Sequence, residues 1–117
     1  MSSNHLTLNL LEGSVSFNFS LTAAQELKTE ISLLIESLKI ITNHHGLGKK
    51  KSIPQNVMSY QHTGEVFLEI FCNPNIWPTP FAAKVLITIC DKNIRLTTEA
   101  ELTRIIEDIN QYLEINM

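Results

Sequence analysis

The chain has 117 residues, of which 44% are hydrophobic and 18% are charged, and its formal net charge at pH 7 is -3. We expect residues 1–117 to form a single domain, because this length supports one real hydrophobic core. The acidic balance argues against a general nucleic-acid-binding role, which requires a basic field over one face. The amino-terminal residues lack a secretory signal, and no apolar run reaches the roughly 20 residues of a membrane span, so we expect a cytoplasmic protein without a membrane partner.

The first two predicted strands form a hairpin. Leucines alternate with polar residues over 5–12, Gly13 and Ser14 supply a tight turn, and apolar and polar residues alternate again over 15–20. Such alternation is typical of a strand that is covered on one face only. Either placement of the hairpin, as an extension of the main sheet or folded over one of its faces, is compatible with this pattern.

A long amphipathic helix is predicted over 23–42. Thr22 at its start and Gln25 three residues later form a capping box. Leu33 and Ile40 form a small ridge that the core of the domain does not need. The stripe expected to pack on the sheet has three- and four-residue spacing and consists of Leu27, Ile31, Leu34, Ile35, Leu38 and Ile41.

Residues 43–55 show neither helical nor strand periodicity and are predicted to form a loop. His44 and His45 have no Asp, Glu or Cys at ligand spacing, so we interpret them as a solvated helix end and not as a metal site. The loop also carries a basic run, interpreted as solvated, with an anion or nucleic-acid contact as the alternative: Lys49, Lys50 and Lys51.

Four more strands and a closing helix complete the predicted order. The strands are expected at 56–62, 65–72, 81–90 and 94–97, and a second capping box at 98–101 begins the helix. Hairpin-linked strands make a mostly antiparallel sheet, so we predict an α+β fold of about six strands with both helices on one face. The element order is strand, strand, helix, four strands, helix. The residues of the last helix expected to be buried are Leu102, Ile105, Ile106, Ile109 and Leu113.

The two central strands of this run are apolar on both sides. The first carries valine, leucine and isoleucine on one side and Phe67 and Phe71 on the other. The helices cover one face, so the second face requires another cover: the ends of the chain, a twin subunit or a different protein. Cys72 and Cys90 lie within these strands and are interpreted as buried thiols.

The segment 73–80 joins these two strands and contains three prolines, which make it a stiff loop. Its tryptophan either closes one end of the core or serves as a rigid aromatic anchor for a partner. The residues predicted to contact a partner are Trp77, Phe67, Phe71, Leu33, Ile40 and Ile76.

The sequence contains no catalytic motif, and we predict neither an enzyme nor a cofactor. The carboxylates of both helices, Asp108 among them, are assigned to solvated faces. The leading hypothesis is a non-enzymatic protein-binding module, an assembly factor or chaperone-like adaptor that uses an apolar sheet face and the Trp-Pro loop. The alternatives are an accessory protein that binds single-stranded DNA and a homodimeric structural protein.

Three parts of the chain carry a likeness at the level of layout: the first helix at 22–41, the strand at 81–91 after Trp77 and Pro78, and 96–102 leading into the closing helix. This layout resembles small cyanobacterial α+β accessory proteins with a whirly-like sheet. Among these, it looks similar to chaperone-type factors that help carboxysome shell proteins assemble. The resemblance implies a non-enzymatic adaptor whose partner is a carboxysome shell subunit. Whirly-like sheets also imply single-stranded DNA binding, against which the acidic balance argues.

Overall fold

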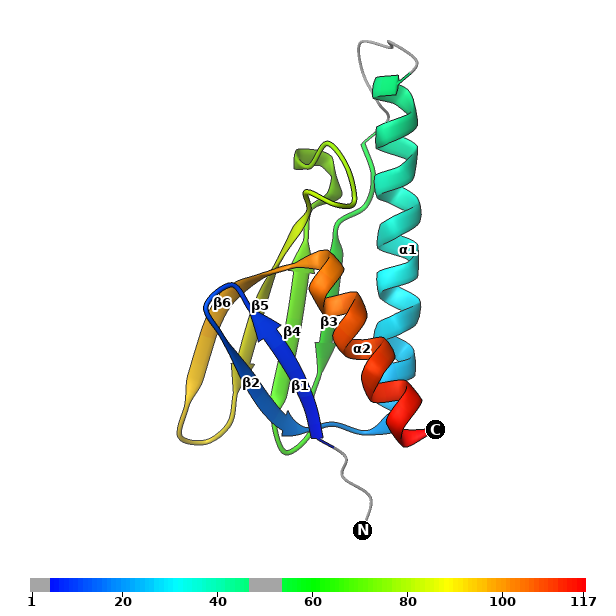
Figure 1. Cartoon of the computed structure of the whole chain (residues 1–117). Coiled ribbons are helices and arrows are strands. Elements are labelled where there is room, and N and C mark those ends of the chain that lie inside the picture. Colours follow the sequence, from blue (N-terminus) through cyan, green and yellow to red (C-terminus); the bar gives the residue numbers. More distant parts are fainter. Residues whose placement is uncertain (1–4, 47–53) are drawn as a thin grey trace.

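The computed structural model describes residues 5–46 and 54–117, and it confirms the predicted α+β element order (Figure 1). The basic run at 49–51 lies outside the described residues. The elements in chain order are β1 (His5–Leu10), β2 (Gly13–Asn18), α1 (Leu21–Gly46), β3 (Met58–His62), β4 (Phe67–Cys72), the short 3-10 helix η1 (Pro74–Ile76), β5 (Lys84–Cys90), β6 (Arg95–Glu101) and α2 (Leu102–Asn116).

The six described strands pair antiparallel, as predicted, but they divide into two sheets. One is the β1-β2 hairpin, and the other has the order β3-β4-β5-β6. The hairpin lies on the same face of the four-stranded sheet as both helices, and therefore neither extends that sheet nor covers its second face. The molecule thus has two layers, with β2, β1, α2 and α1 side by side over β6, β5, β4 and β3 (Figure 1).

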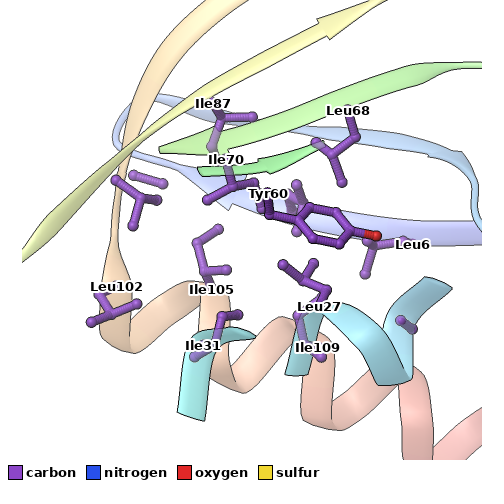
Figure 2. Packing of buried hydrophobic residues seen from close by; sticks show 14 of the residues in the cluster. Leu6, Leu27, Ile31, Tyr60, Leu68, Ile70, Ile87, Leu102, Ile105 and Ile109 are labelled. Atoms are coloured by element: carbon purple, nitrogen blue, oxygen red, sulfur yellow. The ribbon is translucent and has the colours of Figure 1, made fainter. Parts of the chain in front are cut away.

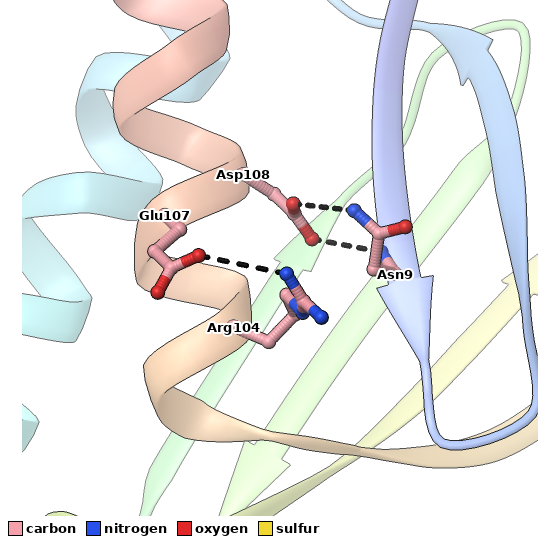
Figure 3. Close-up of polar contacts among 4 residues, drawn as sticks. All are labelled: Asn9, Arg104, Glu107 and Asp108. Atoms are coloured by element: carbon pink, nitrogen blue, oxygen red, sulfur yellow. Dashed lines mark hydrogen bonds and ion pairs between the residues drawn. The ribbon is translucent and has the colours of Figure 1, made fainter.

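A contact between the first and last elements places the hairpin in this layer. Leu11 and Glu12 make the two-residue turn, and Gly13 follows with a φ of 121°, which only glycine adopts easily. The main-chain N–H of Asn9 donates to Oδ2 of Asp108, and its side-chain Nδ2 donates to Oδ1, both at 2.7 Å (Figure 3). The edge of β1 that does not pair with β2 is therefore held against α2.

One hydrophobic core fills the space between the two layers (Figure 2). Alternate residues of β3 to β6 point inward, and the predicted stripe of α1 is buried against them except Ile35, which is half-buried. We call the side of the four-stranded sheet that faces this core the inner face. Side chains that meet in the core come from both helices, the hairpin and the sheet: Leu27, Ile31, Ile105, Ile109, Leu6, Tyr60, Leu68, Ile70 and Ile87.

The first helix begins earlier and ends later than the sequence predicts. Ser20, and not Thr22, caps it, because Oγ of Ser20 accepts the main-chain N–H of Ala23 at 3.1 Å. The helix also continues to Gly46, through the start of the predicted loop. The last residue of this helix is a glycine, which is favoured where helices end.

Strand boundaries also differ from the prediction, most of all at the end of β6 and at the start of β5. The predicted capping box at 98–101 is the end of β6, where Thr98 pairs with Ile87 and Glu101 with Lys84. The inward positions of β6 continue the alternation up to Ala100, which is fully buried, so strand pairing prevails over capping. At the other boundary, β5 begins at Lys84, and 81–83 belong to the preceding turn.

Candidate functional site

The sheet face opposite the core, here called the outer face, is not covered by either helix or by the hairpin (Figure 1). Both helices and the hairpin lie on the inner face (Figure 1). The register of the strands and the alternation of side chains assign the following residues to the outer face: Ser59, Gln61, Phe67, Glu69, Phe71, Lys84, Leu86, Thr88, Cys90, Arg95, Thr97, Glu99 and Glu101.

Two apolar pairs lie on this face. Phe71 pairs with Leu86 across β4 and β5, and the two side chains are 37% and 44% exposed. Phe67 pairs with Cys90 nearer the other end, where both are half-buried. Between the pairs, Glu69 accepts a hydrogen bond from Gln61 at 2.8 Å. The prediction that these strands are apolar on both sides is therefore right for the inner face and only partly right for the outer one.

The charges of the outer face are mostly acidic. Glu69, Glu99 and Glu101 lie on it together with Lys84 and Arg95, and Lys84 stands directly opposite Glu101. Because Glu69 lies between the positions of Phe67 and Phe71 on β4, any base stacked on these rings would bring its phosphate near a carboxylate. The geometry therefore disfavours single-stranded nucleic acid on this face.

Trp77 is half-buried at the end of η1 and packs against the core. Burial raises the pKa of the Cys72 thiol to about 11, and a hydrogen bond with Trp77 opposes that rise. The loop is fixed by Asn75, whose Oδ1 accepts the N–H of Gln55 at 2.7 Å and whose Nδ2 donates to the carbonyl of Gln55 at 2.8 Å. This position agrees with the first interpretation of the tryptophan, in which it closes one end of the core.

The six residues predicted to contact a partner do not share one surface. Phe67 and Phe71 lie on the outer face, whereas Leu33 and Ile40 are exposed on α1, which packs on the inner face. Ile76 is exposed in η1 next to the half-buried Trp77. A partner docked on the outer face therefore contacts only part of the predicted set.

Leu86 is the residue of this face that the predicted contacts missed. Its neighbour across the sheet is Phe71, and that pairing depends on register, which the sequence does not specify in detail. Phe81 was expected inside a strand but lies exposed in the turn before β5. The thiol prediction is confirmed for Cys72, which is buried, whereas Cys90 is half-buried on the outer face.

Comparisons with known proteins give no match among family models, curated proteins or solved structures. The resemblance to whirly-like accessory proteins therefore stays a prediction. Within 5–46 and 54–117, no three His, Cys, Asp or Glu side chains are grouped so that they could hold a metal ion. The helices in the described part of the chain include none that is long and apolar enough to cross a membrane.

Proposed function

We propose that this protein is a non-enzymatic protein-binding module that docks a partner on the outer face of its four-stranded sheet. The observation that carries the proposal is the cross-strand pair of Phe71 and Leu86 on the two central strands, each more than a third exposed on a face that no described element covers. Large apolar side chains that meet on an exposed face mark interaction sites. Phe71 is the rigid aromatic contact, and Leu86 extends it across the sheet.

The charged and apolar residues of the outer face indicate what kind of surface the partner has. Glu99 pairs with Leu86 on β6, and Glu69 is the next outward residue along β4 from Phe71. A complementary surface therefore presents an apolar patch with lysine or arginine at its margin. This chemistry fits an assembly factor. Such a factor shields the apolar patch of its partner until the partner is built into a larger structure. A carboxysome shell subunit is the partner that the family resemblance implies.

The test is affinity capture from the native host with quantitative mass spectrometry. The variant Phe71→Ser with Leu86→Ser removes the apolar pair, and Leu33→Ser with Ile40→Ser removes two similarly exposed apolar residues from α1. We expect the outer-face variant to lose its partner at least tenfold while the α1 variant retains it. Equal recovery by both variants contradicts the proposal, provided that thermal unfolding shows both to be folded.

Sedimentation of the purified protein separates this proposal from the homodimer. If a second copy covers the outer face, the wild-type protein dimerises at micromolar concentration and the outer-face variant is monomeric. A wild-type monomer that captures a different protein supports the adaptor function. A dimer that is broken by the outer-face variant and captures no other protein contradicts it.

A further inference from the structure

The hairpin strand β2 has an open edge without the features that usually prevent strand pairing. It pairs with β1 on one side only, and Gly13–Asn18 contains neither a charged residue nor a proline. Edge strands of soluble proteins are normally protected by lysines, prolines, bulges or a covering element. By contrast, the edge of β6 is occupied at one point, since the N–H of Leu11 donates to the carbonyl of Glu99 at 3.5 Å.

The hydrogen bonds of β1 show which main-chain groups of β2 point away from the hairpin. The N–H of Asn9 bonds to Asp108, so the main chain of Asn9 faces away from β2. Its partner in the register is Ser14, whose main chain therefore faces away from β1. The same orientation recurs at every second residue, at Ser16 and Asn18. Among the described residues, none accepts from or donates to these main-chain groups.

A cavity of about 360 Å³ with both apolar and polar lining residues lies beside this edge, and residues 15–18 of β2 form part of its wall. It is formed between the hairpin and the ends of β4, β5 and β6, and it is open to solvent. The apolar side chains that line it and matter here are Val15, Phe17, Val66, Ile89, Ile94 and Leu96. The cavity therefore offers space for an apolar side chain at the position where a strand added to β2 would place one.

Two carboxylates stand near the cavity. Asp91 lines it, and the N–H groups of Asn93 and Ile94, which donate to its Oδ1 at 2.8 and 2.9 Å, lower the pKa of its carboxyl and keep it ionised. Glu65 accepts a hydrogen bond from the side chain of Asn18 at 3.2 Å, next to the edge of β2. Both carboxylates favour a basic residue in whatever occupies the site.

We propose that an extended segment of another polypeptide adds to β2 as a third strand, with alternate apolar side chains in the cavity and a lysine or arginine beside Glu65 and Asp91. The outward groups of Ser14, Ser16 and Asn18 repeat every second residue, which is the repeat of donors and acceptors in an extended chain. Peptides recognised in this way gain affinity from the main chain and specificity from alternate side chains. The site is separate from the pair of Phe71 and Leu86, so it does not depend on the proposed function.

The experiment is selection of binders from a phage-displayed library of random dodecapeptides on the immobilised full-length protein. We expect enriched peptides to alternate apolar residues and to carry a basic residue. In the isotope-labelled protein, the selected peptide should protect the amides of Ser14, Ser16 and Asn18 from hydrogen exchange. A version of the peptide N-methylated at alternate positions should bind at least tenfold more weakly, because it lacks the main-chain donors.

Three variants make the test specific. Ser16→Pro removes one outward N–H, a substitution that edge strands tolerate because the ladder to β1 is intact. Ile94→Lys removes an apolar side chain and places a positive charge at the cavity, which repels the basic residue of the peptide, and Ile115→Lys is its matched control on α2, since the two isoleucines are 67% and 70% exposed. We expect Ser16→Pro and Ile94→Lys to weaken binding at least tenfold, and Ile115→Lys to leave it unchanged.

Each other outcome overturns the proposal. Enrichment of no common peptide, or binding that survives both Ser16→Pro and Ile94→Lys, shows that the edge does not take a strand. A peptide that binds equally well after N-methylation occupies the cavity without pairing to β2. A dimer of the purified protein that Ser16→Pro dissociates assigns the edge to a second copy of this chain. If Ser16→Pro unfolds the protein, the results for Ile94→Lys and the N-methylated peptide decide between the two outcomes.

Discussion

Asp108 shows how one side chain orders two distant parts of this chain. It is buried on α2, and its two oxygens accept from the main chain and the side chain of Asn9 at 2.7 Å (Figure 3). Because Asp108 lies outside the apolar stripe of the helix, the sequence predicts a solvated position for it, and this prediction was wrong. Its partner lies 99 residues away, and no local pattern marks that pairing. Sequence reasoning at this scale recovers apolar periodicity well and buried polar contacts poorly.

Replacing Asp108 by Ala should destabilise the protein by about 2 to 4 kcal/mol, because it removes two charge-assisted hydrogen bonds and leaves the N–H of Asn9 without its acceptor. Glu107→Ala is the matched control on the next position of the same helix. Its exposed ion pair with Arg104, at 3.6 Å, should be worth less than about 0.5 kcal/mol. Urea unfolding of both variants measures the difference, and equal losses would contradict the structural role of Asp108.

At the scale of single elements, the stripes of α1 and α2 were predicted and their boundaries were not. Most buried residues of both helices follow from three- and four-residue spacing, but Ile106 is half-buried where the sequence predicted burial, and Tyr112 is buried without having been predicted. The end of β6 and the start of α2 depend on whether Thr98 pairs with Ile87 or caps a helix. Both roles suit a threonine, and the neighbouring strand decides between them. The burial of Cys72 could be predicted because the residue lies in an apolar strand. The position of Trp77 could not, because it depends on the geometry of the loop around η1.

The cap of α1 gives a direct test at this scale. Ser20→Ala should destabilise the protein by about 1 kcal/mol, because Oγ of Ser20 accepts the N–H of Ala23. Thr22→Ala, at the position that the sequence indicated as the cap, should change stability by less than about half of that, since Ala is a better helix former inside the first turn. Thermal or urea unfolding compares the two. A larger loss for Thr22→Ala would restore the boundary predicted from the sequence.

For the whole molecule, the two-layer arrangement explains why the outer face is open. A sheet needs one covered face, and here α1, α2 and the hairpin together form that cover. The sequence predicted that the helices lie on one face, but it could not place the hairpin there, because a strand with one apolar side fits any apolar surface. The hairpin covers no part of the outer face, so the outward apolar residues that indicated a second cover are still open there (Figure 1). They are the small set around Phe71 and Leu86.

Two buried tyrosines link separate elements of the fold, and they make the free energy of unfolding depend on pH in the alkaline range. The hydroxyl of Tyr60 on β3 donates to the carbonyl of Ala23 at 3.2 Å, and that of Tyr112 on α2 donates to the carbonyl of Phe19. Burial is the main cause that raises the pKa of Tyr60 from 10.0 to about 12, with Glu26 and Glu30 adding to the shift. Burial also raises the pKa of Tyr112.

The unfolded chain therefore loses these protons at lower pH than the folded one, so the stabilisation is complete below about pH 10 and is lost as pH rises through about 12. We expect the free energy of unfolding, measured in urea over this range, to fall more steeply for the wild type than for Tyr60→Phe. The two slopes should differ by up to about one proton per molecule, because phenylalanine keeps the ring and cannot ionise. Parallel curves would mean that the hydroxyl of Tyr60 ionises equally in both states, and the contact between β3 and the start of α1 would then be open to water.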